Sequence, residues 1–499
     1  MRRRPAAAVA LAATLALAGC AVGYQPTAPE RSEAPTNDHL GYHDGYWYND
    51  TFDIDAAEGL TEAEKRAVFS RAIARVQLLR ELRFEDDVEI DIVTRAEFRA
   101  EFDDVWPEPD EDRRTIDNAQ HEALFLVGPD EDVVDVRRAN QGGTVLGFYQ
   151  PGAERIVIVS GNDPATLDDE LTLAHELLHA LQDQRFGLGP PGSTTLDAVN
   201  ARNGLIEGDA VAVERAYERN CETGEWQCVD VGTGSGGSLP AEFHWGVYFV
   251  GFFPYAEGPS FVEHHRDAGG WDAVDAIYDD YPATSAEIIR PETYDSDVYG
   301  EATVRDRTGG GWERVTVGDD STAATVGRAG LASMFAYTAY AGDSPGVIDR
   351  DAFRNAGSDG LDPDQPYTYD VPYTGGWYGD RLHAYERDGE TAYVWNVTFD
   401  DADDAAAFRE GYERVAEHWG GDRDPTAASE TRFRFGDSSR FDGAVRVDRE
   451  DNAVTVVRAP STAALGDVYA PAAAPAPTAD SALGDARAAP ADGGSATAD

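Results

Sequence analysis

The segment that most constrains the fold is an apolar helical stretch that carries two histidines four residues apart. It reads His175-Glu176-Leu177-Leu178-His179 and is flanked by further apolar residues, Leu171, Leu173, Ala174 and Leu181. Residues four apart lie on one face of a helix, about 6 Å apart along its axis, so both imidazoles can reach one ion. Because burying an unpaired imidazole pair is costly, the segment predicts a buried helix with a shared partner for both rings.

This spacing is typical of a zinc site. Glu176 borders the same site and is the predicted general base, since it can take a proton from metal-activated water. A catalytic zinc ion takes three protein ligands and leaves one position open. We expect the third ligand to be Glu207, which lies 28 residues after His179 in an apolar stretch between two glycines. Asp209 and Glu214 are the alternatives. The predicted cofactor is one catalytic Zn²⁺ on His175, His179 and Glu207.

Two further roles have candidates. Asp183 lies four residues after His179 on the same helical face, and either orients a ligand imidazole or is a solvated carboxylate. Hydrolysis also needs a donor to the oxyanion. The candidates are Tyr294, Tyr217 and His244, of which Tyr294 is taken as the catalytic residue.

Periodicity along the chain predicts an α+β protein. Helices are expected at 61–80, from about Thr166 to Leu181, at 195–220 and at 403–419, and Thr166 with Asp169 resembles a capping box. Residues 144–159 form a predicted hairpin. Further strands are expected at 88–93, 381–385 and 391–399, and near Arg432, Ala444 and Val454.

The chain is strongly acidic. It has 93 Asp and Glu against 41 Lys and Arg, a formal net charge of −52, and Lys65 is its single lysine. This charge excludes nucleic acid as a partner, because such binding depends on a basic surface. Self-repulsion destabilises so charged a protein in dilute buffer, whereas molar salt screens it. The composition therefore indicates a halophilic protein, typical of a haloarchaeon.

The N-terminus is predicted to be an export signal. Three arginines precede an apolar run of about 13 residues, too short to span a bilayer, and Leu17-Ala18-Gly19-Cys20 resembles a lipobox. Cleavage would leave Cys20 as the lipid anchor, so we expect the protein at the extracellular face of the membrane, held only by this lipid. Sequons at Asn49 and Asn396 are possible glycosylation sites. Cys221 and Cys228 remain as a pair, and in an oxidising compartment a disulfide is favoured over a metal site.

Several sequence blocks together resemble a family of exported zincin-like metallopeptidases of the gluzincin type, in particular its haloarchaeal surface lipoproteins. The blocks are Gly147–Pro151, Leu173–Gln184, Leu205–Ala210, Pro282–Tyr294 and Gly375–Arg381. The resemblance implies zinc ligands at His175, His179 and Glu207 and a base at Glu176. It also implies that Arg155–Val159 is a sheet edge on which a peptide lies as an added strand. Arg290 departs from the pattern, where a histidine is expected before Pro291.

We therefore expect a signal peptide (1–19), a spacer (20–45), a zincin-like domain with helices around a small mixed sheet (46–300), a C-terminal α+β domain (301–458) and a disordered tail (459–499). The predicted function is a lipid-anchored extracellular zinc peptidase with a peptide or protein substrate. The alternative is a non-catalytic cell-surface binding protein in which the zinc site is structural or vestigial.

Overall fold

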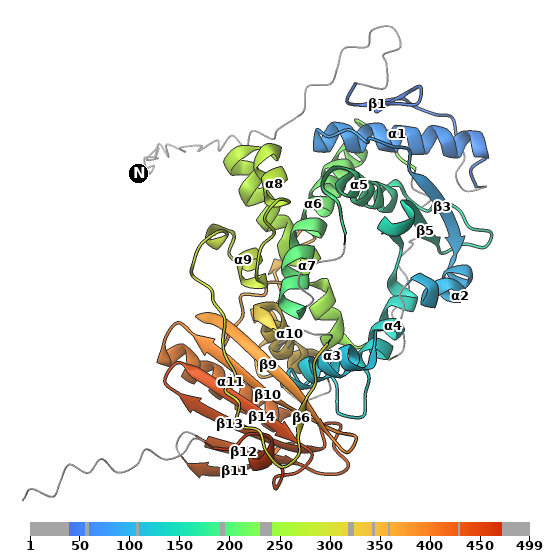
Figure 1. Ribbon diagram of the computed structural model, residues 1–499. Helices are drawn as coiled ribbons and strands as arrows, with labels where there is room; N and C mark the ends of the chain where they lie inside the picture. The colour runs from blue at the N-terminus through green and yellow to red at the C-terminus, as the bar shows by residue number, and fades with distance from the viewer. Residues whose placement is uncertain are drawn as a thin grey trace, which may run out of the picture.

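The computed structural model describes residues 39–54, 59–105, 109–189, 195–229, 242–317, 324–341, 345–357, 360–427 and 430–471. Helices dominate the N-terminal part and a 7-stranded sheet the C-terminal part, which confirms the predicted α+β class (Figure 1). None of the helices in these ranges has the length and apolar character needed to cross a membrane. The predicted signal peptide, Cys20 and most of the predicted spacer lie outside the described residues.

The helical part is built around three helices that pack side by side, α5, α6 and α7 (Figure 1). Its helices are α1 (Glu62–Arg80), α2 (Arg95–Val105), α3 (Glu111–Ala123), α4 (Val133–Thr144), α5 (Glu170–Phe186), α6 (Leu196–Glu222), α7 (Trp245–Gly269), α8 (Trp271–Ile277), α9 (Ser285–Ile289) and α10 (Gly327–Tyr340). Glycine allows the closest contact: a Cβ on Gly208 of α6 would lie 2.3 Å from the carbonyl oxygen of Gly258 in α7.

A small sheet lies against α5. It contains β3 (Glu89–Thr94), β5 (Arg155–Ser160) and β4 (Gly147–Gln150) in that order, with β3 parallel and β4 antiparallel to β5. The expectation that Arg155–Val159 is a sheet edge is therefore wrong, because β3 pairs with its other side. The edge strand that contacts α5 is β4. A separate hairpin, β1 (Tyr42–His43) and β2 (Tyr46–Trp47), contacts α1.

The C-terminal sheet is antiparallel throughout, in the order β11-β12-β13-β14-β10-β9-β6. On β10, Tyr393, Trp395 and Val397 join the large core cluster shared with the helices, whereas Ala392 and Val394 face a second cluster. Because side chains alternate along a strand, β10 contributes to both clusters, and both faces of the sheet are buried there. Its elements are β6 (Glu313–Arg314), β9 (Trp377–Arg387), β10 (Glu390–Phe399), α11 (Ala402–His418), β11 (Asp422–Ala427), β12 (Glu430–Phe435), β13 (Gly443–Glu450) and β14 (Ala453–Ala459), besides the β7–β8 ribbon (Ala356–Gly357, Gly360–Leu361).

Two expected boundaries differ from the structure. The predicted disordered tail begins at 459, but α12 (Leu465–Val468) follows, and Leu465, Val468 and Tyr469 are buried in the second cluster. Their apolar side chains cover the outer face of the sheet, so the fold continues past 459. The predicted domain boundary at 300 places α10 with the sheet, yet α10 packs on α6, α7 and α9 as well.

Buried carboxylates join the two parts. Asp380 of β9 accepts hydrogen bonds from the backbone N–H groups of Val326 (2.8 Å) and Gly327 (2.9 Å), at the start of α10. Asp197 of α6 accepts from the N–H of Ser285 (2.9 Å), and the Ser285 hydroxyl accepts from Ala329 of α10 (3.1 Å). Because these donors are the otherwise unpaired N–H groups of helix ends, the carboxylates fix the sheet and the helices in one orientation.

Candidate metal centre

Helix α5, which carries both histidines, begins one residue after a strong cap. The Asp169 side chain accepts a hydrogen bond from the N–H of Thr172 (2.8 Å), so the cap is Asp169 rather than Thr166. The helix ends at Gly187, whose N–H donates to the carbonyl of Asp183. The intervening residues from Leu173 to Gln182 are all buried, as the apolar flanks predict.

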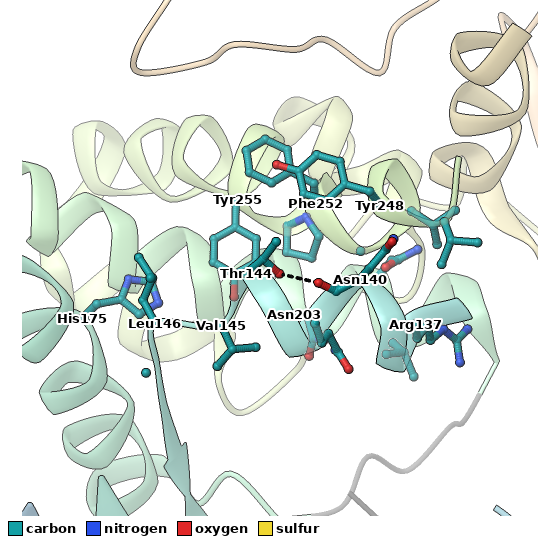
Figure 2. A pocket seen from close by; sticks show the side chains of 18 of the residues that line it. Arg137, Asn140, Thr144, Val145, Leu146, His175, Asn203, Tyr248, Phe252 and Tyr255 are labelled. Carbon is teal, nitrogen blue, oxygen red and sulfur yellow. Dashed lines mark hydrogen bonds between the residues drawn. The ribbon is translucent and has the colours of Figure 1, made fainter. Parts of the chain in front are cut away.

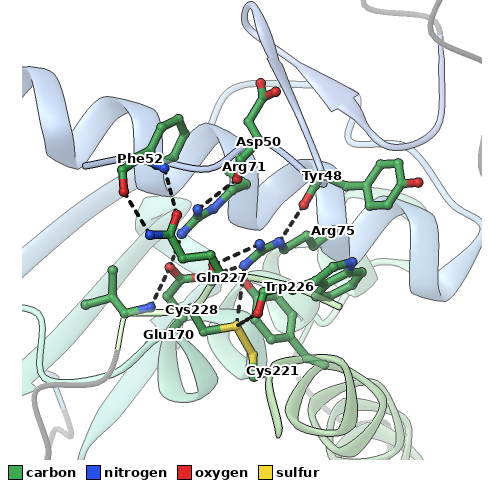
Figure 3. Close-up of polar contacts among 12 residues, drawn as sticks. Tyr48, Asp50, Phe52, Arg71, Arg75, Glu170, Cys221, Trp226, Gln227 and Cys228 are labelled. Carbon is green, nitrogen blue, oxygen red and sulfur yellow. Dashed lines mark hydrogen bonds and ion pairs between the residues drawn. A yellow bond between two sulfur atoms is a disulfide. The ribbon is translucent and has the colours of Figure 1, made fainter. Parts of the chain in front are cut away.

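A buried ionic cluster fixes the start of α5 (Figure 3). Glu170 accepts hydrogen bonds from Arg75 of α1 (2.8 Å) and from Tyr217 of α6 (2.5 Å), and it also pairs with Arg71. Three helices therefore meet on one carboxylate. The predicted disulfide between Cys221 and Cys228 is present beside them. It closes the turn after α6, in which the carbonyl of Gln227 accepts from Arg75 (3.0 Å).

The three predicted metal ligands come together. The Nε2 atom of His175 lies 3.2 Å from Nε2 of His179 and 3.2 Å from Oε2 of Glu207, and the last two atoms are 3.3 Å apart. The histidines lie on consecutive turns of α5, and Glu207 faces them from α6. Among the described residues, these three form a group of side chains that could hold a metal ion.

Each imidazole is fixed through its other nitrogen. Nδ1 of His175 lies 2.9 Å from Oε2 of Glu214, two turns after Glu207 on α6. Nδ1 of His179 lies 2.9 Å from Oε1 of Gln182. The amide nitrogen of Gln182 donates to the carbonyl of Ile206 (2.9 Å), which can only accept, so the oxygen of Gln182 must face His179. Both Nδ1 atoms therefore donate, and both Nε2 lone pairs converge on one point with a carboxylate oxygen.

Neither alternative for the third ligand occupies that position. Glu214 orients His175 instead, as described above. Asp209 pairs with Arg80 of α1 (2.9 Å) and accepts from the hydroxyl of Tyr278 (2.8 Å). The Asp209 carboxylate also accepts from the amide nitrogen of Gln182 (3.3 Å). Asp209 therefore supports Gln182, the residue that orients His179.

Asp183 does not orient an imidazole, which corrects that expectation. Its carboxylate accepts from the hydroxyl of Tyr149 (2.9 Å) and from the N–H of Leu188 (2.6 Å). It thereby joins the end of α5 to the edge strand β4. Gln182, one residue earlier, takes the predicted role because its side chain reaches the Nδ1 atom of His179 (2.9 Å).

The predicted oxyanion donors lie elsewhere. The Tyr294 hydroxyl donates to the carbonyl of Asp280 (2.6 Å), and its ring packs on Phe261 and His265 in the second half of α7. Tyr217 belongs to the Glu170 cluster. His244 caps α7, its Nδ1 accepting from Val247 (3.1 Å). The catalytic assignment of Tyr294 therefore has no support from its position.

Tyr255 of α7 is the residue that sequence reasoning missed. Its ring stacks on His175 (6.1 Å between centroids), its hydroxyl lies near the carboxylate of Glu207, and the residue as a whole is 36% exposed. Burial and the neighbouring carboxylates raise its pKa well above the usual value, so the phenol stays protonated. The sequence signal was weak, because the first half of α7, in which Tyr255 lies, is apolar on all sides and the helix contains Pro254 and Pro259.

The cluster attracts positive charge. Burial lowers the pKa of His175, but hydrogen bonds to Glu207 and Glu214 outweigh the effect of burial and raise this pKa well above its usual value. Burial likewise opposes ionisation of Glu207, but His179 and His175 lower its pKa. Burial raises the pKa of Glu176, and the two imidazoles offset part of this rise.

A cavity of about 840 Å³ opens onto this cluster (Figure 2). His175 and Glu176 line one end, next to Gly147, where a Cβ would lie 3.1 Å from the Glu176 side chain. The walls come from α3, α4, α6 and α7. The arrangement combines a three-ligand cation site, a neighbouring carboxylate and space for an extended ligand, which are the parts that metal-assisted hydrolysis requires.

Comparisons with known proteins cover the other part of the chain. A family model described as a domain of unknown function (DUF8575) matches residues 313–469, which hold α10 and the 7-stranded sheet. None of the curated proteins and none of the solved structures compared with the chain matches it. The ligand cluster on α5 and α6 lies outside the matched residues, so its chemistry is argued from its geometry.

Proposed function

We propose that this protein is a zinc-dependent peptidase of the zincin-like type. The observation that carries the proposal is the spacing of the three ligand atoms, 3.2, 3.2 and 3.3 Å. A tetrahedral zinc ion with bonds of about 2.0–2.1 Å requires about 3.3–3.4 Å between its ligand atoms. Both Nε2 lone pairs and the carboxylate point to the same place, so the residues fit the ion.

The chain's own groups supply the proton transfers. Zinc, when bound, polarises the carbonyl of the substrate and acidifies a water molecule. Glu176 lines the cavity directly after the ligand His175. We expect its carboxylate to take a proton from the attacking water and to pass it to the leaving amine.

Tyr255 is the proposed oxyanion donor in place of Tyr294. Its protonated hydroxyl lies at the ligand carboxylate of Glu207 and its ring lines the cavity. A donor fixed at this position can stabilise the negative charge that develops on the substrate carbonyl oxygen.

The open cavity favours catalysis over the non-catalytic alternative. A structural zinc site is closed by a fourth protein ligand, whereas a catalytic site leaves one position to water. The ligand group has three members among the described residues, and the cavity reaches His175. The alternative in which zinc only joins α5 to α6 gives no reason for this space.

We further propose that the enzyme works outside the cell, anchored by lipid at Cys20. The disulfide between Cys221 and Cys228 supports an oxidising compartment. Mass spectrometry of the mature N-terminal peptide tests the anchor: Cys20 should carry a lipid in wild type, and Cys20→Ser should yield no lipid-modified peptide.

The test of the enzyme is zinc content and hydrolysis, measured on the chain purified in molar KCl. We expect one zinc per chain in wild type and a strong loss in His179→Ala and Glu207→Ala. His264→Ala, at an exposed histidine outside the cluster, is the matched control. Glu176→Gln should keep its zinc and lose at least about 100-fold of its peptide hydrolysis. Undiminished hydrolysis in Glu176→Gln, or no zinc after reconstitution, would refute the proposal.

A further inference from the structure

The cavity is a channel between two parallel stripes of side chains. Helix α4 contributes Arg137, Asn140, Gln141 and Thr144, and α7 contributes Tyr248, Gly251, Phe252 and Tyr255, with Val247, Val250 and Pro254 beside them. Both sets have the spacing i, i+3, i+4, i+7, so each is one face of its helix. On α7 the stacked rings of Tyr255, Phe252 and Tyr248 continue the stack that starts at His175. Figure 2 shows both stripes extending from His175 towards Arg137.

The far end of this channel is positively charged. Arg113, Arg137 and Asp117 are the charged residues that line it. Asp117 pairs with both guanidiniums, at 3.4 Å from Arg113 and 3.7 Å from Arg137, and the charge of Asp132, outside the lining, also acts on Arg137. Two guanidiniums and one carboxylate of the lining therefore lie at this end of the channel. In the whole chain, acidic residues outnumber basic ones by 93 to 41, so an excess of arginine here runs against the composition.

The length of the channel sets the spacing of a bound ligand. Arg137 and Thr144 are seven residues apart, which corresponds to about 10 Å along α4. Gly147, three residues after Thr144, lies beside Glu176. An extended peptide advances about 3.3 Å per residue, so the stretch from Arg137 to Thr144 alone spans about three residues, and the ligand cluster lies beyond it.

We propose that the channel selects peptides that carry a carboxylate at a fixed position, about three or more residues from the bond that is cleaved, with Arg113 and Arg137 as its binding site. The inference rests on the peptidase function proposed above. Guanidinium groups bind carboxylates through paired, charge-assisted hydrogen bonds. The carboxylate comes from an Asp or Glu side chain or from the C-terminus of the peptide. Because molar salt screens charges beyond about 3 Å, only such direct contacts give selectivity in a halophilic medium.

The cleavage test uses neutral peptides of constant length in which one glutamate is moved a single position at a time. The zinc-loaded enzyme acts on them in molar KCl, and mass spectrometry maps the cuts. We expect the cut to follow the glutamate at a constant distance of about three or more residues. Where the cut instead keeps a constant distance from a free C-terminus, and C-terminal amidation abolishes it, the peptide terminus supplies the carboxylate. A cut site that follows neither group overturns the inference while the peptidase function stands.

A binding test measures the selectivity of the channel without peptide hydrolysis. Zinc-loaded Glu176→Gln should bind a glutamate peptide about tenfold or more tightly than its glutamine analogue, by fluorescence anisotropy. Adding Arg137→Gln should abolish this preference, and Arg137→Glu should reverse it in favour of a lysine peptide. Arg66→Gln, which removes an exposed guanidinium on α1 outside the channel lining, is the control and should keep the preference. Equal binding of both peptides overturns the inference, whether or not wild type cleaves them.

Discussion

At the scale of single residues, the groups that do not touch the metal decide how firmly it is held. Glu214 and Gln182 fix the tautomers of the two histidines through their Nδ1 atoms, both at 2.9 Å. The sequence motif identifies the ligands because their spacing is local. It cannot identify Glu214 as the partner of His175, since that contact depends on how α6 rotates against α5.

The role of Glu214 can be tested by zinc affinity. Glu214→Ala should weaken zinc binding about 10–100-fold, because the ring of His175 loses the acceptor that orients it. Glu214→Gln should lie between this variant and wild type, since its amide oxygen still accepts. Competition with a chromogenic chelator measures the affinity. Glu218→Ala, one turn later at an exposed position, should match wild type. Unchanged affinity in Glu214→Ala would contradict the role.

A second residue-scale prediction concerns pH. Burial raises the pKa of Asp197 to about 7 from 3.8; hydrogen bonds from Ser285 oppose the rise and the charge of Asp380 adds to it. Between pH 3.8 and about pH 7, Asp197 is protonated in the folded chain but ionised in the unfolded chain. The contribution of Asp197 to stability is therefore present in acid and is lost as the pH rises towards 7.

Asp197→Asn imitates the protonated acid, so its stability should not show this loss. The free energy of unfolding of wild type minus that of Asp197→Asn should fall by a few kcal/mol between about pH 4 and about pH 7.5, at about 1.4 kcal/mol per pKa unit. Urea unfolding in molar KCl measures both proteins, and Asp112→Asn, at an exposed position, is the control. A pH-independent difference would contradict the assignment.

At the scale of elements, the sequence predicts those segments whose apolar residues recur with the period of a helix or a strand. The predicted helices at 61–80 and 195–220 correspond to α1 and α6, and the strand at 391–399 lies within β10. Helix α7 was not predicted, because its first half is apolar on all sides and shows no helical period. β3 was predicted as a strand, but not its pairing with β5, which joins segments about 65 residues apart and leaves no local pattern.

The contact between α6 and α7 yields a prediction at this scale. Gly208→Ala places a Cβ 2.3 Å from a backbone oxygen of Gly258, which cannot move aside, so the helices must separate. We expect a loss of about 1–3 kcal/mol in the free energy of unfolding. Gly251→Ala is the matched control on α7, where a Cβ meets nothing within 4 Å, and should stabilise the helix by up to about 1 kcal/mol. Equal unfolding midpoints for the two variants would contradict the close contact.

At the scale of the whole molecule, several of the scarce arginines are buried in ion pairs. Arg71, Arg75 and Arg80 are among the largest fully buried side chains, and each pairs with a buried or half-buried carboxylate. Composition alone predicts an acidic protein, but not which of its arginines are buried. Six arginines and ten Asp and Glu are buried among the described residues, so the large excess of carboxylates remains at the surface.

This distribution predicts how salt acts on stability. The buried pairs are shielded from solvent ions, so salt acts on the repulsion between surface carboxylates. The thermal midpoint should rise steeply between about 0.1 M and about 1 M KCl, as the screening length falls from about 10 to about 3 Å, and more slowly above. Calorimetry measures the midpoint, and a neutral osmolyte at matched osmolality controls for effects of excluded cosolvent. An equal rise with the osmolyte would contradict screening, because an uncharged solute leaves the repulsion in place.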